Sequence, residues 1–527
     1  MTEHVDVLIV GAGLSGIGAA DHLRRSRPGA TYVILEAREE IGGTWDLFRY
    51  PGVRSDSDMQ TLGYRLRPWT GDKSIADGQS ILSYVRDTAR EAGIDKNIRF
   101  GHRVVSMDWS WRDARWTVEA EHNGAQIRFT AGFLQTCTGY YRYDRGHSPE
   151  FPGIKGFRGQ VVHPQLWPDN LDWAGKKVVV VGSGATAVTL VPALAEKAAL
   201  VTMLQRSPSY IARVPARDGM DLALRRFIGD RRAYPITRWK NIVVSLGSYA
   251  VSKRFPEFMK GVLRKDLEKQ LPSGFDIDTH FSPRYGPWDE RLCAAPDGDI
   301  FEVISDGRAD VVTDRIDTFT ETGIRLASGR ELEADVVVTA TGLEMLFLGG
   351  ATMSVDGREV RPPERIVYKG LMLDGVPNFA FAFGYTNSSW TLRADLVHEY
   401  VCRLLEFMAD RGYRTCVPVP SDQAMDRGPL LGLSSGYVRR GLSQLPSSGT
   451  KAPWRMGNNY LRDLVTLRHG RLDDGNLLFG APVPRREPVT PRSEHARSHR
   501  KAVESEGRTA TGCSEAAVLP QGETQTG

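Results

Sequence analysis

Cysteine is scarce in this chain, and its cysteines form no recognisable pair. Five occur among 527 residues, and no two of them stand in a C-x-x-C arrangement. This absence excludes a thioredoxin-like dithiol and a zinc knuckle, so we expect no metal site, and it suits a reducing cytoplasm. The five residues are Cys137, Cys293, Cys402, Cys416 and Cys513.

The chain also lacks long apolar runs and a strong charge of one sign. No run reaches the ~18 apolar residues of a membrane-spanning helix, so we expect no segment to cross a bilayer. The first strand-like run begins within a few residues of Met1, which leaves no room for a signal peptide. The net charge of +4 is too small to indicate nucleic acid by itself. With 41% apolar and 25% charged residues, the 527-residue chain is predicted to be globular, with two or three domains.

What the sequence does contain is two glycine-rich loops, each directly after an apolar, strand-like run. The first run, residues 5–10, leads into the first glycine loop (residues 11–16), and the next run, residues 32–35, ends in an acid. Such glycines permit a tight turn, the following helix N-terminus faces a pyrophosphate, and the acid accepts hydrogen bonds from a ribose. We therefore predict a dinucleotide site. Its candidate residues are Gly11, Gly13, Gly16 and Glu36.

The second glycine loop (residues 182–187) follows the run at residues 177–181. Ala187 replaces the third glycine, whose role is helix packing. The next strand-like run ends in Arg206 and not in an acid, which favours a 2′-phosphate and hence NADPH over NADH. The alternative is that Arg206 is a solvated charge at a strand end. The candidate residues here are Gly182, Gly184, Ala185, Thr186, Arg206 and Ser207.

Four further segments carry motifs. A glycine- and proline-rich loop, residues 42–56, would ordinarily be interpreted as a turn around a buried tryptophan. Residues 157–168 have the form F-x-G-x-x-x-H-x-x-x-W-P, and a buried run after residue 333 ends in A-T-G. A polar loop at residues 384–391 precedes a predicted helix, whose start it could simply cap. The residues of interest are Gly43, Thr44, Trp45, Arg54, Asp56, Phe157, Gly159, His163, Trp167, Thr341, Gly342, Asn387 and Trp390.

Taken in this order, the motifs resemble those of the class B flavin monooxygenases of Baeyer–Villiger type. The resemblance covers about residues 3–480 and is greatest to the ethionamide-activating type. It implies an α/β fold with two Rossmann-like dinucleotide-binding domains, for FAD and NADPH, and a helical insertion. The implied division is 1–150 for the first part of the FAD domain, 151–335 for the NADPH domain with an insertion at 217–283, and 336–484 for the second part of the FAD domain. From about Arg485 onward polar and charged residues dominate, so residues 485–527 are predicted to form a disordered tail.

The resemblance also implies an activity. Such enzymes consume NADPH and insert one oxygen of O2 into ketones through a C4a-peroxyflavin, giving esters or lactones, and many oxidise sulfides or thioamides. The catalytic guanidinium would be Arg291, because it stays charged beside a developing anion, with Asp56 holding it and Arg54 nearby. The alternative is that Arg291 is an ordinary surface ion-pair partner. Glu290 stands where the family often has lysine, which shifts the phosphate contact toward Arg206.

The resemblance implies that residues 157–168 connect the two nucleotide units. His163 has the chemistry of a general base, yet neither hydride transfer nor oxygen insertion requires one here. We expect His163 and Trp167 to pack and hydrogen-bond so that they control the relative motion of the two units.

Three other functions remain open. One is an N- or S-oxygenating flavin monooxygenase without Baeyer–Villiger activity, and another is a non-oxygenating flavoprotein redox module. A flavin disulfide reductase is disfavoured by the missing C-x-x-C. The sequence indicates neither the individual substrate nor the oligomeric state.

Residues 217–283 fit neither nucleotide unit and are predicted to be helical. Between Arg225 and Lys269 there are twelve Lys and Arg against four Asp and Glu. Such a stretch is usually a solvated helix face. The alternatives are a lid over the substrate or a weak, peripheral contact with a membrane by an otherwise cytoplasmic protein.

Overall fold

The computed structural model describes residues 2–480, except residues 291, 423–424 and 433–434. The predicted tail at 485–527 and the catalytic candidate Arg291 therefore lie outside the described residues. Within the described ranges, no helix is long and apolar enough to cross a membrane.

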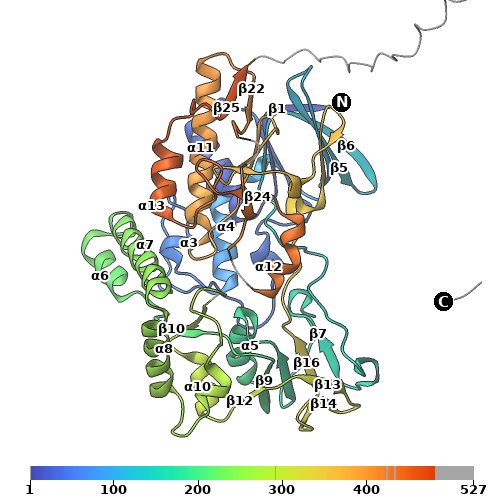
Figure 1. The fold of residues 1–527 in the computed structure, drawn as a ribbon, viewed down its shortest axis with the longest axis vertical. Helices are drawn as coiled ribbons and strands as arrows, with labels where there is room; N and C mark the ends of the chain where they lie inside the picture. The colour runs from blue at the N-terminus through green and yellow to red at the C-terminus, as the bar shows by residue number, and fades with distance from the viewer. Residues whose placement is uncertain (1, 291, 423–424, 433–434, 481–527) are drawn as a thin grey trace, which may run out of the picture. The chain divides into compact units, whose positions relative to one another are not determined.

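Nine strands form the first sheet, in the order β18-β17-β4-β5-β6-β1-β2-β3, with β21 beside β6. Its strands β1, β5 and β6 are labelled in the upper part of Figure 1. Strand β1 pairs in parallel with β2 and β6, whereas β4, β5 and β6 form an antiparallel meander. The last strand of the meander, β6, therefore joins it to the parallel part of the sheet. The strands are β1 Glu3–Val10, β2 Tyr32–Leu35, β3 Ile98–Arg99, β4 Arg103–Ser110, β5 Arg115–His122, β6 Ala125–Thr136, β17 Thr352–Val355, β18 Arg358–Glu359 and β21 Phe379–Phe381.

Strand β1 is apolar along its length because both of its faces are covered. Val7 and Ile9 face a core built with helices α1 (Leu14–Ser26), α4 (Gly78–Glu91) and α11 (Trp390–Asp410). Leu8 and Val10 face a second core that contains the buried tryptophans of the meander. The alternation of side chains along a strand thus sends neighbouring residues to different cores.

The second sheet has five strands, all parallel, in the order β12-β9-β8-β16-β7. Helices α5 (Ala185–Ala195) and α10 (Asp299–Ser305) cover one face, and a three-stranded antiparallel sheet covers the other. The strands are β7 Gln160–Val162, β8 Lys177–Val181, β9 Leu200–Gln205, β12 Ala309–Thr313 and β16 Val336–Thr339, with β13 Ile316–Phe319, β14 Gly323–Leu326 and β15 Glu331–Glu333 in the covering sheet. The predicted α/β fold with two Rossmann-like units is confirmed.

One boundary was wrong. Strand β16, at residues 336–339, was expected to begin the return to the first unit, yet it lies in the second sheet between β7 and β8. The apolar sequence of a strand buried on both faces is compatible with the first sheet and with the second. Only its pairing with strands far away in the sequence determines the sheet to which it belongs. The return therefore comes after Thr339.

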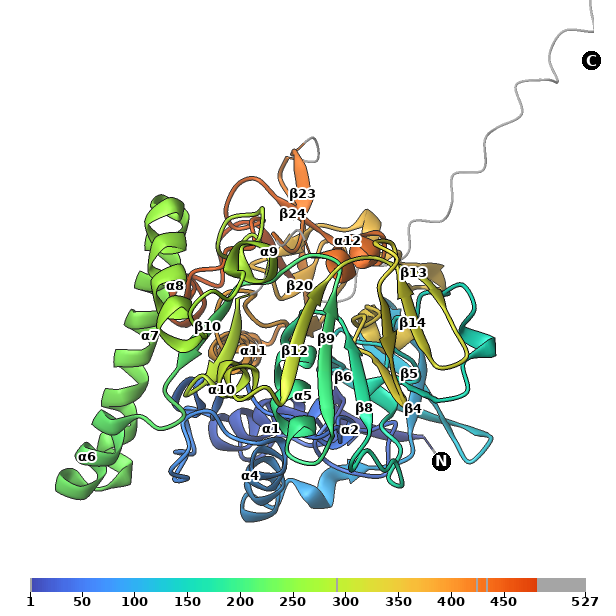
Figure 2. The ribbon, with the colours of Figure 1, turned by 90° about the horizontal axis from the view of Figure 1, so that it is seen from below.

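The segment at 217–283 is helical, as predicted. Strands β10 (Ile211–Val214) and β11 (Cys293–Pro296) pair in parallel at its two ends, so the insertion leaves and rejoins the unit at one place. Both views place α6 and α7 at the margin of the ribbon, outside the sheets (Figures 1 and 2). The helices are α6 Gly219–Ile228, α7 Asp230–Arg254, α8 Pro256–Gln270 and α9 Ile277–Phe281.

Short elements complete the described chain. The remaining helices are α2 Thr44–Leu47, α3 Met59–Leu62, α12 Gly436–Gly441 and α13 Tyr460–Asp463. The remaining strands are β19 Val367–Tyr368, β20 Met372–Leu373, β22 Thr415–Pro418, β23 Arg427–Pro429, β24 Ser447–Gly449 and β25 Leu477–Gly480.

Candidate functional site

A cavity of about 420 Å³ opens where the two glycine loops approach each other. Its wall combines the start of α1, the segment 42–57 (hereafter the cavity segment), the start of α5 and the turn after β16. Ligands of such folds bind outside the carboxyl ends of parallel strands, which is where these loops lie. The predicted site residues in the wall are Gly13, Gly43, Thr44, Trp45, Arg54, Asp56, Gly184, Ala185, Thr186, Gly342 and Trp390.

The first glycine loop leaves no room for side chains. Gly11 has φ +102°, and a Cβ on Gly16 would lie 1.8 Å from the Gly11 carbonyl oxygen. The buried Glu36 carboxylate accepts hydrogen bonds from the backbone N–H of Ala12 at 2.7 Å and of Arg38 at 2.9 Å. Burial raises the pKa of Glu36. Gly11, Gly16 and Glu36 thus shape the loop from outside the cavity wall.

The polar loop before α11 reaches the first glycine loop. The Trp390 indole N–H donates to the Ser15 hydroxyl at 2.7 Å, and the indole stacks on Tyr140 with ring centroids 5.2 Å apart. Asn387 lies just behind the wall, where its amide donates to the Asn458 carbonyl at 3.0 Å. This arrangement places the first turn of α11 at the predicted nucleotide site.

Three buried polar atoms fit a polar ligand in this region. The hydroxyls of Ser55 and Ser435 line the cavity, and the Asn387 side-chain oxygen lies behind it. None of the three has a hydrogen-bond partner among the described residues. Because a buried polar group without a partner is costly, such atoms favour a bound molecule rich in hydroxyl and amide groups.

Within the cavity segment, Arg54 is engaged elsewhere than expected. Its guanidinium forms a two-pronged ion pair with Asp299 at the start of α10, with one N–O distance of 3.3 Å. Asp56 is exposed and lines the cavity. Burial raises the pKa of Tyr50 to about 12, and its hydroxyl pairs with the Thr186 side chain. The cavity segment therefore contacts the second unit at two places, the start of α10 and the second glycine loop.

The second glycine loop repeats the geometry of the first. Gly182 has φ +138°, and a Cβ there would lie 2.4 Å from the Ala340 carbonyl oxygen. The Ser183 hydroxyl donates to the Ser207 carbonyl at 3.0 Å. Arg206 follows β9 directly and is exposed, outside the cavity wall. Arg206 and Ser207 thus lie beside the loop.

His163 ties the segment 157–168 to the A-T-G turn. Its Nδ1 accepts the Gln165 N–H at 3.2 Å, so Nε2 carries the proton and donates to the Gly342 carbonyl at 3.2 Å. Burial lowers the pKa of His163, which keeps the ring neutral. The Thr341 hydroxyl on the same turn donates to the His147 carbonyl.

The other candidate residues of the segment 157–168 pack against neighbouring elements. Phe157 meets Phe319 edge to face at 5.8 Å, and Trp167 meets Trp173 in the same way at 5.9 Å. A Cβ on Gly159 would lie 2.4 Å from the Asp335 carbonyl oxygen, so glycine is required for close approach.

The catalytic candidate Arg291 lies outside the described residues. Its neighbours Glu290 and Cys293 line the cavity. Sequence reasoning missed Asp299, the partner of Arg54, and three tyrosines of the wall: Tyr140, Tyr141 and Tyr143. The tyrosines follow Gly139 directly after β6, and this aromatic run at a strand end was a usable signal.

Comparison with known proteins agrees with this geometry. Residues 72–230 match the model of the flavin-binding monooxygenase-like family, and residues 9–65 match an NAD(P)-binding Rossmann-like domain. The FAD-containing monooxygenase EthA of Mycolicibacterium smegmatis is 54% identical over 480 residues, which cover 91% of this chain and 98% of that protein. EthA of Mycobacterium tuberculosis is 52% identical over 486 residues, 92% of this chain and 99% of that protein.

Solved structures share the fold at low sequence identity. An oxidised steroid monooxygenase bound to NADP has a TM-score of 0.71 at 21% identity, over 90% of this chain and 99% of that one. An open cyclohexanone monooxygenase has a TM-score of 0.70 at 19% identity, over 91% and 100%. Together with the extent of identity to EthA, these matches show that the chain belongs to the class B flavin monooxygenases.

Proposed function

We propose that this protein is an FAD- and NADPH-dependent Baeyer–Villiger monooxygenase, which inserts one oxygen atom of O2 into ketones to give esters or lactones and also oxidises sulfides or thioamides. The observation that carries the proposal is the single cavity whose wall includes both glycine loops and the cavity segment. The FAD-containing EthA relatives and the NADP-bound steroid monooxygenase support the two cofactors.

The first unit would hold FAD. The first glycine loop and the N-terminus of α1 take the pyrophosphate, and Glu36 faces the ribose. Ser55, Ser435 and Asn387 offer the polar atoms that lack partners among the described residues. FAD, once bound and reduced by NADPH, supplies the activation of O2.

The second unit would hold NADPH. The second glycine loop and the N-terminus of α5 take its pyrophosphate, while Arg206 contacts the 2′-phosphate with Ser207 beside it. Because Glu290 lines the cavity where a lysine often stands in the family, Arg206 carries most of the phosphate contact. His163 and Trp167 hold the connection between the units, through the Gly342 carbonyl and the Trp173 ring.

Three charged residues would serve the oxygen transfer. Arg291 stabilises the negative charge that develops at the reacting oxygen, since a guanidinium stays charged and does not readily give up a proton. Asp56, in the cavity wall, orients that guanidinium. Arg54 positions the cavity segment through Asp299.

The domain division follows the sheets. We assign the FAD domain to 1–150 and 340–484, and the NADPH domain to 151–339 with its insertion. A cytoplasmic location is proposed with it, because the chain has only five cysteines and no C-x-x-C pair, which suits a reducing compartment.

Product analysis tests the function. The FAD-loaded enzyme is incubated with NADPH, labelled O2, and separately a cyclic ketone, an aryl methyl sulfide and a tertiary amine. A labelled lactone supports the proposal. Labelled sulfoxide or N-oxide without lactone supports an N- or S-oxygenating enzyme, and NADPH oxidation that yields no labelled product with any compound supports a redox module.

A further inference from the structure

The exposed apolar side chains of this protein are concentrated on the helical insertion. Of sixteen large apolar side chains that are exposed among the described residues, ten lie on or beside helices α6, α7 and α8. These helices lie at the margin of the ribbon in both views (Figures 1 and 2). The ten are Met220, Phe227, Ile228, Ile236, Trp239, Val243, Val244, Phe255, Phe258 and Val262.

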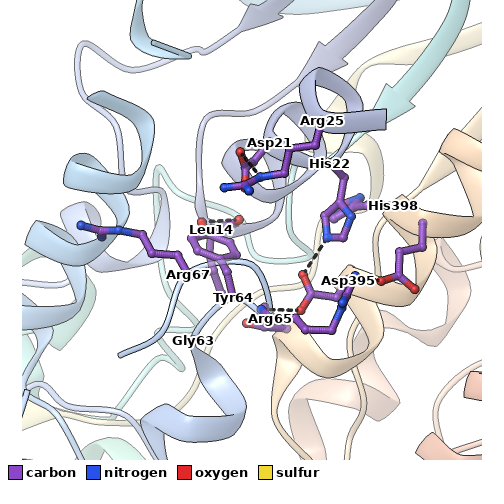
Figure 3. A network of polar contacts seen from close by, with 12 residues as sticks. Leu14, Asp21, His22, Arg25, Gly63, Tyr64, Arg65, Arg67, Asp395 and His398 are labelled. Carbon is purple, nitrogen blue, oxygen red and sulfur yellow. Dashed lines mark hydrogen bonds and ion pairs between the residues drawn. The ribbon is translucent and has the colours of Figure 1, made fainter. Parts of the chain in front are cut away.

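Helix α7 is anchored by one face. On that face the buried Arg238 donates to the carbonyl oxygens of Gln60 at 2.7 Å and Gly63 at 2.8 Å, and to the Asp395 carboxylate at 3.2 Å. Asp395, on α11, also accepts from His22 and from the backbone N–H of Arg65 (Figure 3). Contacts of this kind fix which side of α7 faces outward.

The outward face of α7 is an uncharged stripe. Residues at spacings of three and four share one side of a helix, and the exposed residues at that spacing are all uncharged between two arginines. The stripe consists of Ile236, Trp239, Val243, Gly247 and Ala250, bounded by Arg232 and Arg254. Trp239 also meets Tyr460 of α13, with ring centroids 6.0 Å apart.

Cations surround this apolar surface. Several basic residues of the insertion are neutralised, for example Lys240 by Asp218 and Lys253 by Asp289. Six exposed ones have no ion pair with any described residue, which leaves a local excess of positive charge. The six are Arg226, Arg231, Arg232, Arg254, Lys265 and Lys269.

An anionic bilayer surface would complement both the exposed apolar side chains and the exposed cations of the insertion. Exposed Trp and Phe side chains insert at the level of the headgroups, and Arg and Lys beside them pair with anionic lipid. A second copy of this chain fits less well, because a two-fold contact would set the same cations against each other. The charge pattern therefore selects the lipid surface.

We propose that the outward faces of α6, α7 and α8 form a peripheral docking surface for membranes that contain anionic lipid. The apolar stripe enters the interface, and the exposed arginines and lysines contact the headgroups. This surface is distinct from the cavity, whose wall includes no residue of the three helices.

Vesicle co-sedimentation with the full-length holoenzyme tests the proposal. Vesicles of phosphatidylcholine alone are compared with vesicles that also contain phosphatidylglycerol, at about 0.1 M salt. The protein should bind the anionic vesicles and be released by high salt. Trp239→Gln with Val243→Gln should weaken binding at least about tenfold, because two apolar groups no longer enter the interface. Arg231→Gln with Arg232→Gln should weaken it about fivefold per charge, and only on anionic vesicles.

The control is Tyr413→Gln with Leu478→Gln. These side chains are 37% and 50% exposed, close to the 43% and 59% of Trp239 and Val243, but lie outside the insertion. The control should bind as the parent does, and all variants should retain NADPH oxidation and melting temperature. No binding to anionic vesicles, or equal loss in the control, would overturn the proposal. It would also be overturned if light scattering without lipid showed a dimer that Trp239→Gln with Val243→Gln converts to monomer.

Discussion

Arg54 and Asp299 are joined by a two-pronged ion pair across 245 residues of chain. Their side chains are only 14% and 28% exposed, so solvent screens the pair incompletely. Arg54 belongs to the cavity segment and Asp299 begins α10, so the pair links the cavity segment to a helix that covers the second sheet.

Breaking this pair should therefore affect stability and turnover together. Arg54→Ala and Asp299→Ala should each lower the free energy of unfolding by about 1–3 kcal/mol, and the double variant should lose little more than either single one. Urea unfolding of the four proteins measures the coupling. The exposed pair Arg325–Asp317 is the control and should show a coupling below about 1 kcal/mol. Strictly additive losses at Arg54 and Asp299 would contradict a direct interaction.

Arg206 should set the choice of nicotinamide cofactor. Arg206→Ala should raise the KM for NADPH about tenfold or more and leave the KM for NADH nearly unchanged, because only NADPH carries the 2′-phosphate. Steady-state kinetics with both cofactors checks this. Arg315, an exposed arginine beyond the neighbouring strand β12, supplies the control Arg315→Ala. Equal changes for the two cofactors would argue against the phosphate contact.

Trp390 should matter for FAD retention. Trp390→Phe keeps an aromatic ring against Tyr140 but loses the hydrogen bond to Ser15, so FAD affinity should fall about three- to tenfold. Titration of apoprotein with FAD, followed by flavin fluorescence, measures the change. Trp454→Phe also removes a buried indole hydrogen bond, to Asn476, and should bind FAD as the parent does. Unchanged affinity in Trp390→Phe would remove this residue from the FAD site.

Arg291 should separate flavin reduction from oxygen insertion. Arg291→Ala should still allow NADPH to bleach the flavin, yet ester formation should fall by at least about 10²–10³. Stopped-flow absorbance follows the first step, and product mass follows the second. Arg291→Lys should keep part of the activity, since lysine has the positive charge but not the planar guanidinium group. Full ester formation in Arg291→Ala would refute the role.

His398 should make the fold sensitive to acid. Burial, aided by the neighbouring His22, lowers the pKa of His398 from 6.5 to about 3. Between these two pKa values the imidazole is protonated in the unfolded chain but neutral in the folded chain. The free energy of unfolding therefore falls as the pH drops below about 6.5. At pH 5 the loss should be about 2 kcal/mol.

The variant His398→Asn isolates this effect. Asn can still accept the hydrogen bond that Gln135 donates to His398, but it does not titrate. Urea unfolding at pH 7 and pH 5 should show a smaller pH dependence in the variant than in the parent. An identical pH dependence would assign the acid sensitivity to other groups.

Local constraint explains what the sequence could predict. At Gly11, Gly16 and Gly182 a backbone carbonyl, either of the same loop or of the end of an adjacent strand, lies too close for a side chain. Only glycine fits there, so the spacing of the glycines alone indicated both loops. Apolar runs flanking them located β1, β2, β8 and β9. Asp56 and Trp390 were selected from motif segments and Thr186 from the second glycine loop, and the structure brings the three together in one cavity wall.

Long-range pairing explains what the sequence could not predict. The partner of Arg54 lies 245 residues away, and that of Arg238 lies 157 residues away. No periodicity or local motif identifies such partners. The sheet to which β16 belongs was predicted wrongly for the same reason. The four residues of β16, three valines and a threonine, are suited to either sheet.

The anchoring of α7 by Arg238 has an evolutionary and practical consequence. The contacts of Arg238 all come from the inner face of α7, so Ile236, Val243 and Ala250 on its outer face can change without disturbing them. Substitutions on the outer face of this one 25-residue helix would therefore redirect a relative to a different cellular surface. The same separation offers an engineer a place to attach the enzyme to a chosen support while its chemistry stays untouched.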